Sequence, residues 1–127
     1  MGGPEEAFRI IEAAAEPHVG VVMDTFHFYR AGVTNLPSYP VDKFSLVHVN
    51  DAEDLPIEQL KDANRLHVGQ GILPLEDYLR ALAAGKYDGL LSVEIFRPEY
   101  WEQPVTQVVR EASESLGKLT EKIGVGL

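Results

Sequence analysis

Cysteine is absent from the 127 residues of this chain, which excludes disulfide bonds, thiolate metal ligands and cysteine nucleophiles together. Long hydrophobic runs are absent as well, since no stretch approaches the ~20 apolar residues that a membrane-spanning helix needs. The start of the sequence carries neither the basic segment nor the apolar segment of a signal peptide. We therefore expect a cytoplasmic protein without a membrane partner.

Basic side chains are scarce. The chain has 11 Lys and Arg against 20 Asp and Glu, which leaves a formal net charge of −9. Such a surface repels phosphate backbones, and no cluster of basic residues offsets the repulsion, so we expect no nucleic-acid partner. Hydrophobic residues make up 45% of the chain and charged residues 24%, as in globular proteins. We expect a single domain over residues 1–127.

Three short, largely apolar runs, at residues 19–23, 45–49 and 89–93, are typical of strands buried on both faces, as in parallel sheets. Helical patterns occupy residues 4–16, 74–84 and 104–123, and in the last we expect Val105 and Val109 to face the core. A helical turn is expected at residues 25–29, whereas 32–40 and 52–64 have the composition of loops. Strands that alternate with helices predict βαβ units, and therefore an α/β fold with parallel strands flanked by helices.

Each predicted strand carries a metal-ligand type of residue at or near its end. Asp24 follows the first strand, His48 lies near the end of the second, and Glu94 follows the third. Because parallel strands end at the same rim, these side chains are expected to meet there, where α/β proteins place their active sites. One imidazole and two carboxylates suit Mn²⁺, Zn²⁺ or Mg²⁺.

Each of these residues also has a structural interpretation. Asp24 could simply cap the following helix, and His48 could be a hydrogen-bonded core histidine. Glu94 is harder to explain structurally, since an unpaired carboxylate is costly to bury. The position of all three at one rim favours the metal site.

Four motifs, in order along the chain, resemble those of the xylose-isomerase-like (β/α)8 barrels, which include ketose 3-epimerases, inosose isomerases and dehydratases. They are Asp24-Thr25-Phe26-His27 with Gly32, Val47-His48-Val49-Asn50-Asp51, Asn64-Arg65 with Gly69-Gln70-Gly71, and Tyr87-Asp88-Gly89 with Ser92-Val93-Glu94. A complete barrel of this kind takes roughly 250 residues. The resemblance therefore implies the C-terminal part of a TIM barrel, with about three βα units.

The resemblance also implies a site and an activity. Asp24, His48 and Glu94 would bind a divalent metal, and Glu94 would double as an acid/base group. His27 and Arg65 would contact oxygens of a sugar or polyol. The activity would be a metal-dependent isomerisation or epimerisation, in which a proton next to a carbonyl moves through an enediolate.

The chain departs from the family pattern at two points. Asn64 stands where the family has Asp before the Arg of the turn. The fourth metal ligand of the family, a Glu from the strand before the one that ends at Asp24, has no counterpart here. We therefore expect the isolated chain to be inactive and to form a homo-oligomer or associate with the missing half-barrel through its open sheet edges.

Two other functions remain open. An endonuclease IV-like nuclease shares the barrel, but needs an Asp-Arg-His triplet where this chain has Asn64-Arg65-Leu66, with His67 out of register. The net charge of −9 also argues against it. The second alternative is a non-catalytic metal-binding or self-associating module.

Overall fold

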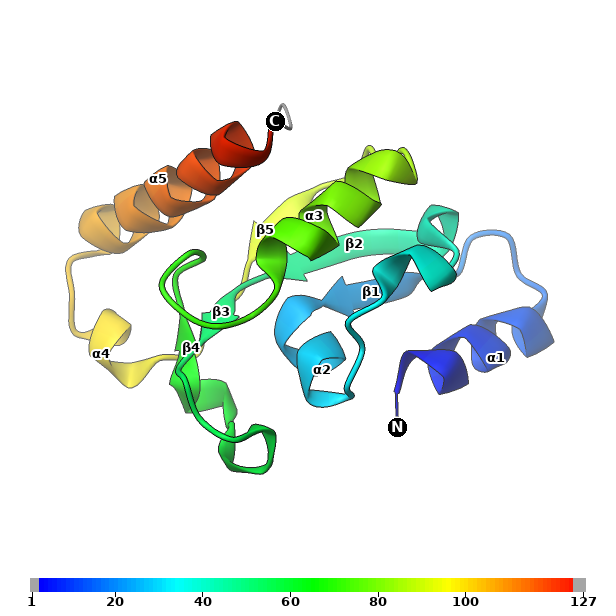
Figure 1. Cartoon of the computed structure of the whole chain (residues 1–127), viewed down its shortest axis with the longest axis horizontal. Coiled ribbons are helices and arrows are strands. Elements are labelled where there is room, and N and C mark those ends of the chain that lie inside the picture. Colours follow the sequence, from blue (N-terminus) through cyan, green and yellow to red (C-terminus); the bar gives the residue numbers. More distant parts are fainter. Residues whose placement is uncertain (1–2, 125–127) are drawn as a thin grey trace.

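The computed structural model describes residues 3–124, and its centre is a sheet of three parallel strands. The strands are β1 (Val21–Asp24), β2 (Phe44–Val49) and β5 (Leu91–Val93), in the order β1-β2-β5 (Figure 1). All three lie within or close to the predicted runs. The predicted α/β fold with parallel strands flanked by helices is confirmed.

The described part of the chain has five α-helices: α1 (Pro4–Ala14), α2 (Thr25–Arg30), α3 (Leu75–Ala84), α4 (Pro98–Trp101) and α5 (Val105–Ile123). The first begins at a proline with Glu5 and Glu6 in its first turn, which suits the positive end of the helix dipole. It ends where Ala15 adopts a left-handed conformation. None of the helices within residues 3–124 is long and apolar enough to cross a bilayer.

One face of the sheet is packed and the other is open. Met23, Val47 and Val49 are fully buried in an apolar cluster that also contains residues of α3 and α5. Val22, which points the other way, is 49% exposed. The prediction that the strands are buried on both faces is therefore wrong for this chain. In a closed barrel the second face would line the interior, which three strands cannot enclose.

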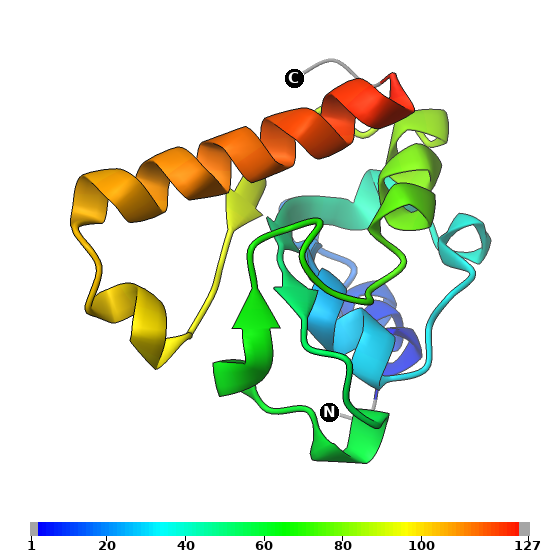
Figure 2. The same ribbon diagram turned by 60° about the vertical axis from the view of Figure 1, so that its left-hand side comes forward.

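The start of α5 also departs from the prediction. Val105 is 77% exposed and Val109 62% exposed, whereas Leu116 and Leu119 near the other end are buried. Figures 1 and 2 show α4 and the N-terminal half of α5 extending away from the sheet. The apolar face of the helix is present throughout, but only its C-terminal half meets α3.

Short elements occupy the segments that were expected to be loops. The strands β3 (Asp51–Ala52) and β4 (Arg65–Leu66) pair antiparallel, and the 3₁₀ helices η3 (Ile57–Gln59) and η4 (Asp62–Asn64) lie between them. Two further 3₁₀ helices, η1 (Leu36–Ser38) and η2 (Val41–Lys43), precede β2. The β3–β4 pair brings Arg65 to the rim where the parallel strands end.

Candidate metal centre

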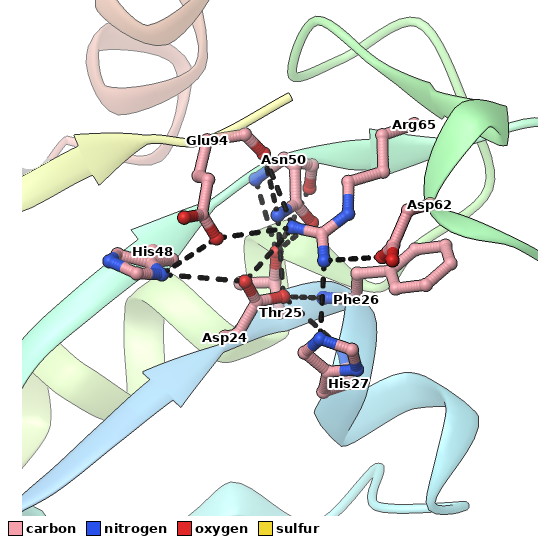
Figure 3. A network of polar contacts seen from close by, with 9 residues as sticks. All are labelled: Asp24, Thr25, Phe26, His27, His48, Asn50, Asp62, Arg65 and Glu94. Carbon is pink, nitrogen blue, oxygen red and sulfur yellow. Dashed lines mark hydrogen bonds and ion pairs between the residues drawn. The ribbon is translucent and has the colours of Figure 1, made fainter. Parts of the chain in front are cut away.

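The structure brings Asp24, His48 and Glu94 together. Asp24 is paired with His48 in the β1–β2 register, and Glu94 follows directly after β5. Nδ1 of His48 lies 2.9 Å from Oε2 of Glu94 and 3.5 Å from Oδ2 of Asp24 (Figure 3). One ligand atom from each residue lies within 4.8 Å of the others. This spacing and donor set fit a single divalent cation.

Asp24 combines the two roles that its position suggested. It is the N-cap of α2, and its Oδ1 accepts hydrogen bonds from the backbone N–H groups of Phe26 at 2.9 Å and His27 at 3.2 Å. Its other oxygen, Oδ2, faces His48 and Arg65. The cap fixes the orientation of the carboxylate, so one oxygen remains directed toward the ligand cluster.

Arg65 is a buried cation beside this cluster, with 1% of its surface exposed. Nη1 lies 3.0 Å from Oδ2 of Asp24 and 3.5 Å from Oε2 of Glu94, and it donates to the Glu94 carbonyl. Nη2 donates to Oδ1 of Asp62 at 2.8 Å and lies 3.2 Å from Nε2 of His27. Three carboxylates thus compensate the buried charge.

The same cation keeps Asp24 ionised. Burial by itself would raise the pKa of Asp24, but the Arg65 guanidinium and hydrogen bonds from Asn50 and the His27 amide outweigh it. The pKa of Asp24 therefore lies below its usual range. A carboxylate that is anionic at neutral pH is the form that a cation requires.

Two uncharged residues that the sequence analysis did not select lie next to the ligands. Asn50 donates from Nδ2 to Oδ1 of Asp24 at 3.3 Å and to the Glu94 carbonyl at 3.1 Å. Thr25 donates from its hydroxyl toward Oδ1 of Asn50 at 2.8 Å. Both residues are fully buried. Their only signal in the sequence is a polar residue next to a strand end, which many turns share.

A cavity of about 820 Å³ opens in front of the cluster, on the unpacked side of the sheet. Asp24, His48 and Glu94 line it, together with His27 and Arg30. Arg65 lies behind these residues and has no place in the cavity wall. A substrate oxygen could reach Nη2 of Arg65 only by displacing the His27 ring or the Asp62 carboxylate.

Asp51, which follows the histidine motif, has a local structural role. Its carboxylate accepts hydrogen bonds from the backbone N–H groups of Ala52, Gly69 and Leu73. Burial raises the pKa of Asp51 although these amide bonds oppose the shift. Gly71 packs so closely here that an added Cβ would lie 2.0 Å from the Ala52 carbonyl oxygen. Asp51 therefore holds the Gly69-Gln70-Gly71 turn.

His67 lies apart from the cluster. It is 2% exposed, stacks on Tyr100 at 4.4 Å between ring centroids, and has Nε2 3.5 Å from Oε2 of Glu111. Burial lowers the pKa of His67, and Glu111 only partly opposes the shift. Among residues 3–124, the one group of three potential metal ligands is Asp24, His48 and Glu94.

Residues 1–119 match the family model of the xylose isomerase-like TIM barrel, so the chain belongs to that family. Its three parallel strands and their helices are part of such a barrel, as the motifs predicted. Curated relatives with named activities include an inosose isomerase and a 3-dehydroshikimate dehydratase. The inosose isomerase of Halalkalibacterium halodurans is 32% identical over 119 residues, which are 92% of this chain and 42% of that protein. The 3-dehydroshikimate dehydratase of Pseudomonas putida is 28% identical over 122 residues, 93% of this chain and 19% of that protein.

Among solved structures, the IOLI protein with a bound zinc atom superimposes with a TM-score of 0.87 and 32% identity. The match covers 94% of this chain and 44% of that protein. The chain thus spans less than half the length of these relatives.

Proposed function

We propose that this chain carries part of the active site of a metal-dependent isomerase or epimerase that acts on a sugar or polyol. The observation that carries the proposal is the convergence of Asp24, His48 and Glu94 within 4.8 Å at the wall of an open cavity. The similarity to an inosose isomerase supports a ketone of a cyclic polyol as the class of substrate.

Asp24, His48 and Glu94 would hold the divalent ion. The zinc atom in the IOLI protein supports Zn²⁺, while Mn²⁺ and Mg²⁺ suit the same donors. The ion would supply positive charge next to a substrate carbonyl and so favour loss of the neighbouring proton. The Glu94 side chain is 35% exposed, and its carboxylate is the acid/base group proposed to take up that proton.

His27 and Arg65 are proposed to contact substrate oxygens. His27 lies in the cavity wall and is exposed, so its ring can meet a substrate directly. For Arg65 the contact requires the substrate to displace either the His27 ring, 3.2 Å from Nη2, or the Asp62 carboxylate, 2.8 Å from it. With or without bound substrate, the Arg65 guanidinium would remain paired with Asp24 and keep that carboxylate anionic.

The proposed site is incomplete within this chain. A barrel needs further strands on both sides of the β1-β2-β5 sheet, and proton removal and return at neighbouring carbons calls for a second acid/base group. We propose that the chain works together with the remaining part of a barrel, or in a homo-oligomer that covers the open edges. By itself it would be a metal-binding module with negligible turnover. The dehydratase relative leaves loss of hydroxide as an alternative outcome of the same proton removal.

Proton exchange in deuterated water tests the proposal. A complete barrel that contains this chain, loaded with Zn²⁺ or Mn²⁺, should exchange the proton next to the carbonyl of an inosose, as followed by NMR. Glu94→Gln should reduce the exchange by about 10²–10⁴-fold. Glu58→Gln, at an exposed glutamate of the same cavity, is the control. Absence of exchange in the metal-loaded barrel would exclude the isomerase.

A further inference from the structure

We infer that Thr25 and Asn50 are positioning residues, which set the spacing of the three candidate ligands without touching the cation or the substrate. The inference rests on the proposed function, because it concerns the same site. The last pairs of the parallel sheet are Asp24 with His48 and Val49 with Val93.

Beyond these pairs the strands are joined by side chains. One further backbone hydrogen bond runs from the Glu94 N–H to the Val49 carbonyl at 3.2 Å. Beyond this hydrogen bond, the side chains of Thr25 and Asn50 link the ends of the strands. The Thr25 hydroxyl accepts from the Asn50 N–H at 3.1 Å and lies within donor distance of both the Asn50 carbonyl and its Oδ1. This joins the end of β1 to the end of β2.

Asn50 continues the connection to the third strand. Its Nδ2 group has two hydrogens, and its two partners are Oδ1 of Asp24 at 3.3 Å and the Glu94 carbonyl at 3.1 Å. Both partners are acceptors, while the Thr25 hydroxyl on the other side is a donor. The amide therefore satisfies all of these groups in one orientation only. A single side chain thus holds two candidate ligand residues, Asp24 at the end of β1 and Glu94 directly after β5, at a fixed separation.

Burial makes this connection hard to replace. Thr25 and Asn50 are both 0% exposed, so water cannot take the place of a lost hydroxyl or amide. Loss of the Asn50 amide would leave Asp24 with its cap bonds from α2 but without its tie to Asn50, and the Glu94 carbonyl would lose a donor. Loss of the Thr25 hydroxyl would leave Oδ1 of Asn50 without its donor and so release the amide that makes these two contacts. Groups that orient metal ligands in this way typically change metal affinity by about 10–100-fold when removed.

Three variants of the full chain separate positioning from general stability. Thr25→Val keeps the shape of the side chain and removes the hydroxyl, whereas Thr25→Ser retains the hydroxyl. Thr120→Val is the matched control, because it removes a buried hydroxyl that bonds only to backbone carbonyls within α5. The Zn²⁺ dissociation constant is measured by competition with a chromophoric chelator at neutral pH.

We expect the dissociation constant to rise about 10–100-fold in Thr25→Val and to stay within about threefold of the parent in the other two variants. Equal affinity in Thr25→Val and the parent would overturn the inference and leave the proposed function intact. An equal loss of Zn²⁺ affinity in Thr120→Val would mean that the effect comes from reduced stability, and it would also overturn the inference. If the parent binds no Zn²⁺, the proposed function fails, and the inference with it. Should circular dichroism show that Thr25→Val is unfolded, Asn50→Ala replaces it, with the same expected rise and the same contrary outcome.

Discussion

Arg65 and Asp24 are 41 positions apart in the sequence, yet Nη1 of the arginine lies 3.0 Å from Oδ2 of the aspartate. The side chains are 1% and 8% exposed, so the pair is nearly sealed from water. The guanidinium also lies 4.6 Å from the centroid of the Phe26 ring. This contact ties the β3–β4 segment to the end of β1 and places a positive charge directly behind the ligand cluster.

Replacing Arg65 with Met should lower the free energy of unfolding by about 3–5 kcal/mol, because it leaves a buried carboxylate without its cation. Urea denaturation in metal-free buffer measures the change. Arg97→Met is the matched control, since the Arg97 side chain is 18% exposed and its partner Glu53 is 38% exposed. A pair open to water should cost about 1 kcal/mol or less. Equal losses in the two variants would mean that the buried Arg65–Asp24 pair contributes no more to the free energy of unfolding than the more exposed Arg97–Glu53 pair.

His67 should make the protein sensitive to mild acid. Burial holds the pKa of His67 below its ordinary value of 6.5, so the folded state resists a proton that the unfolded chain accepts. The contribution of neutral His67 to the free energy of unfolding is therefore fully present above pH 6.5 and decreases as the pH falls below that value. Phe at position 67 can still stack on Tyr100 but does not titrate. In His67→Phe the free energy of unfolding should therefore fall less between about pH 8 and about pH 5 than it does in the parent. Urea denaturation at the two pH values measures it, and an undiminished loss would assign the sensitivity to other groups.

Two glycine substitutions should have effects of opposite sign. Gly71→Ala places a Cβ 2.0 Å from the Ala52 carbonyl oxygen and 2.6 Å from Oδ1 of Asp51, so the turn must move, at about 1–3 kcal/mol. Gly117→Ala lies within α5 with nothing inside 4 Å, and it should stabilise the protein by about 0.5–1 kcal/mol. Thermal unfolding of both variants checks the pair. A neutral Gly71→Ala would show that the turn adjusts without cost.

The open sheet should make the isolated chain self-associate. Light scattering is expected to detect a dimer or a larger species, because β1 and β5 each present an unpaired edge in the described sheet. Val22→Lys places a charge on the exposed side of β1 and should shift the population toward monomer. Ile10→Lys is the control, since Ile10 is 53% exposed but belongs to helix α1 and not to the sheet. A monomeric parent at high concentration would contradict this prediction.

The strand ends were predictable from sequence because apolar runs end abruptly at Asp24 and Glu94, and parallel strands share one rim. The exposure of Val105 was not predictable, since helical periodicity identifies an apolar face but does not show whether another element packs on it. The position of Arg65 depends on a two-residue antiparallel pair, too short to give a periodic signal. The roles of Thr25 and Asn50 depend on which strands become neighbours, so they could be recognised only once the strand order was known.

The two oxygens of Asp24 have different roles: Oδ1 caps the start of α2, and Oδ2 faces the candidate ligand cluster. Few residue types at position 24 could fill both roles. Asn, Ser and Thr cap helices as well as Asp does, but they bring no negative charge to a cation. Glu brings the charge, but its longer side chain is not among the residues that cap well. Among these residues aspartate alone meets both requirements, so the donor set of the proposed metal site would be easier to change at His48 or Glu94.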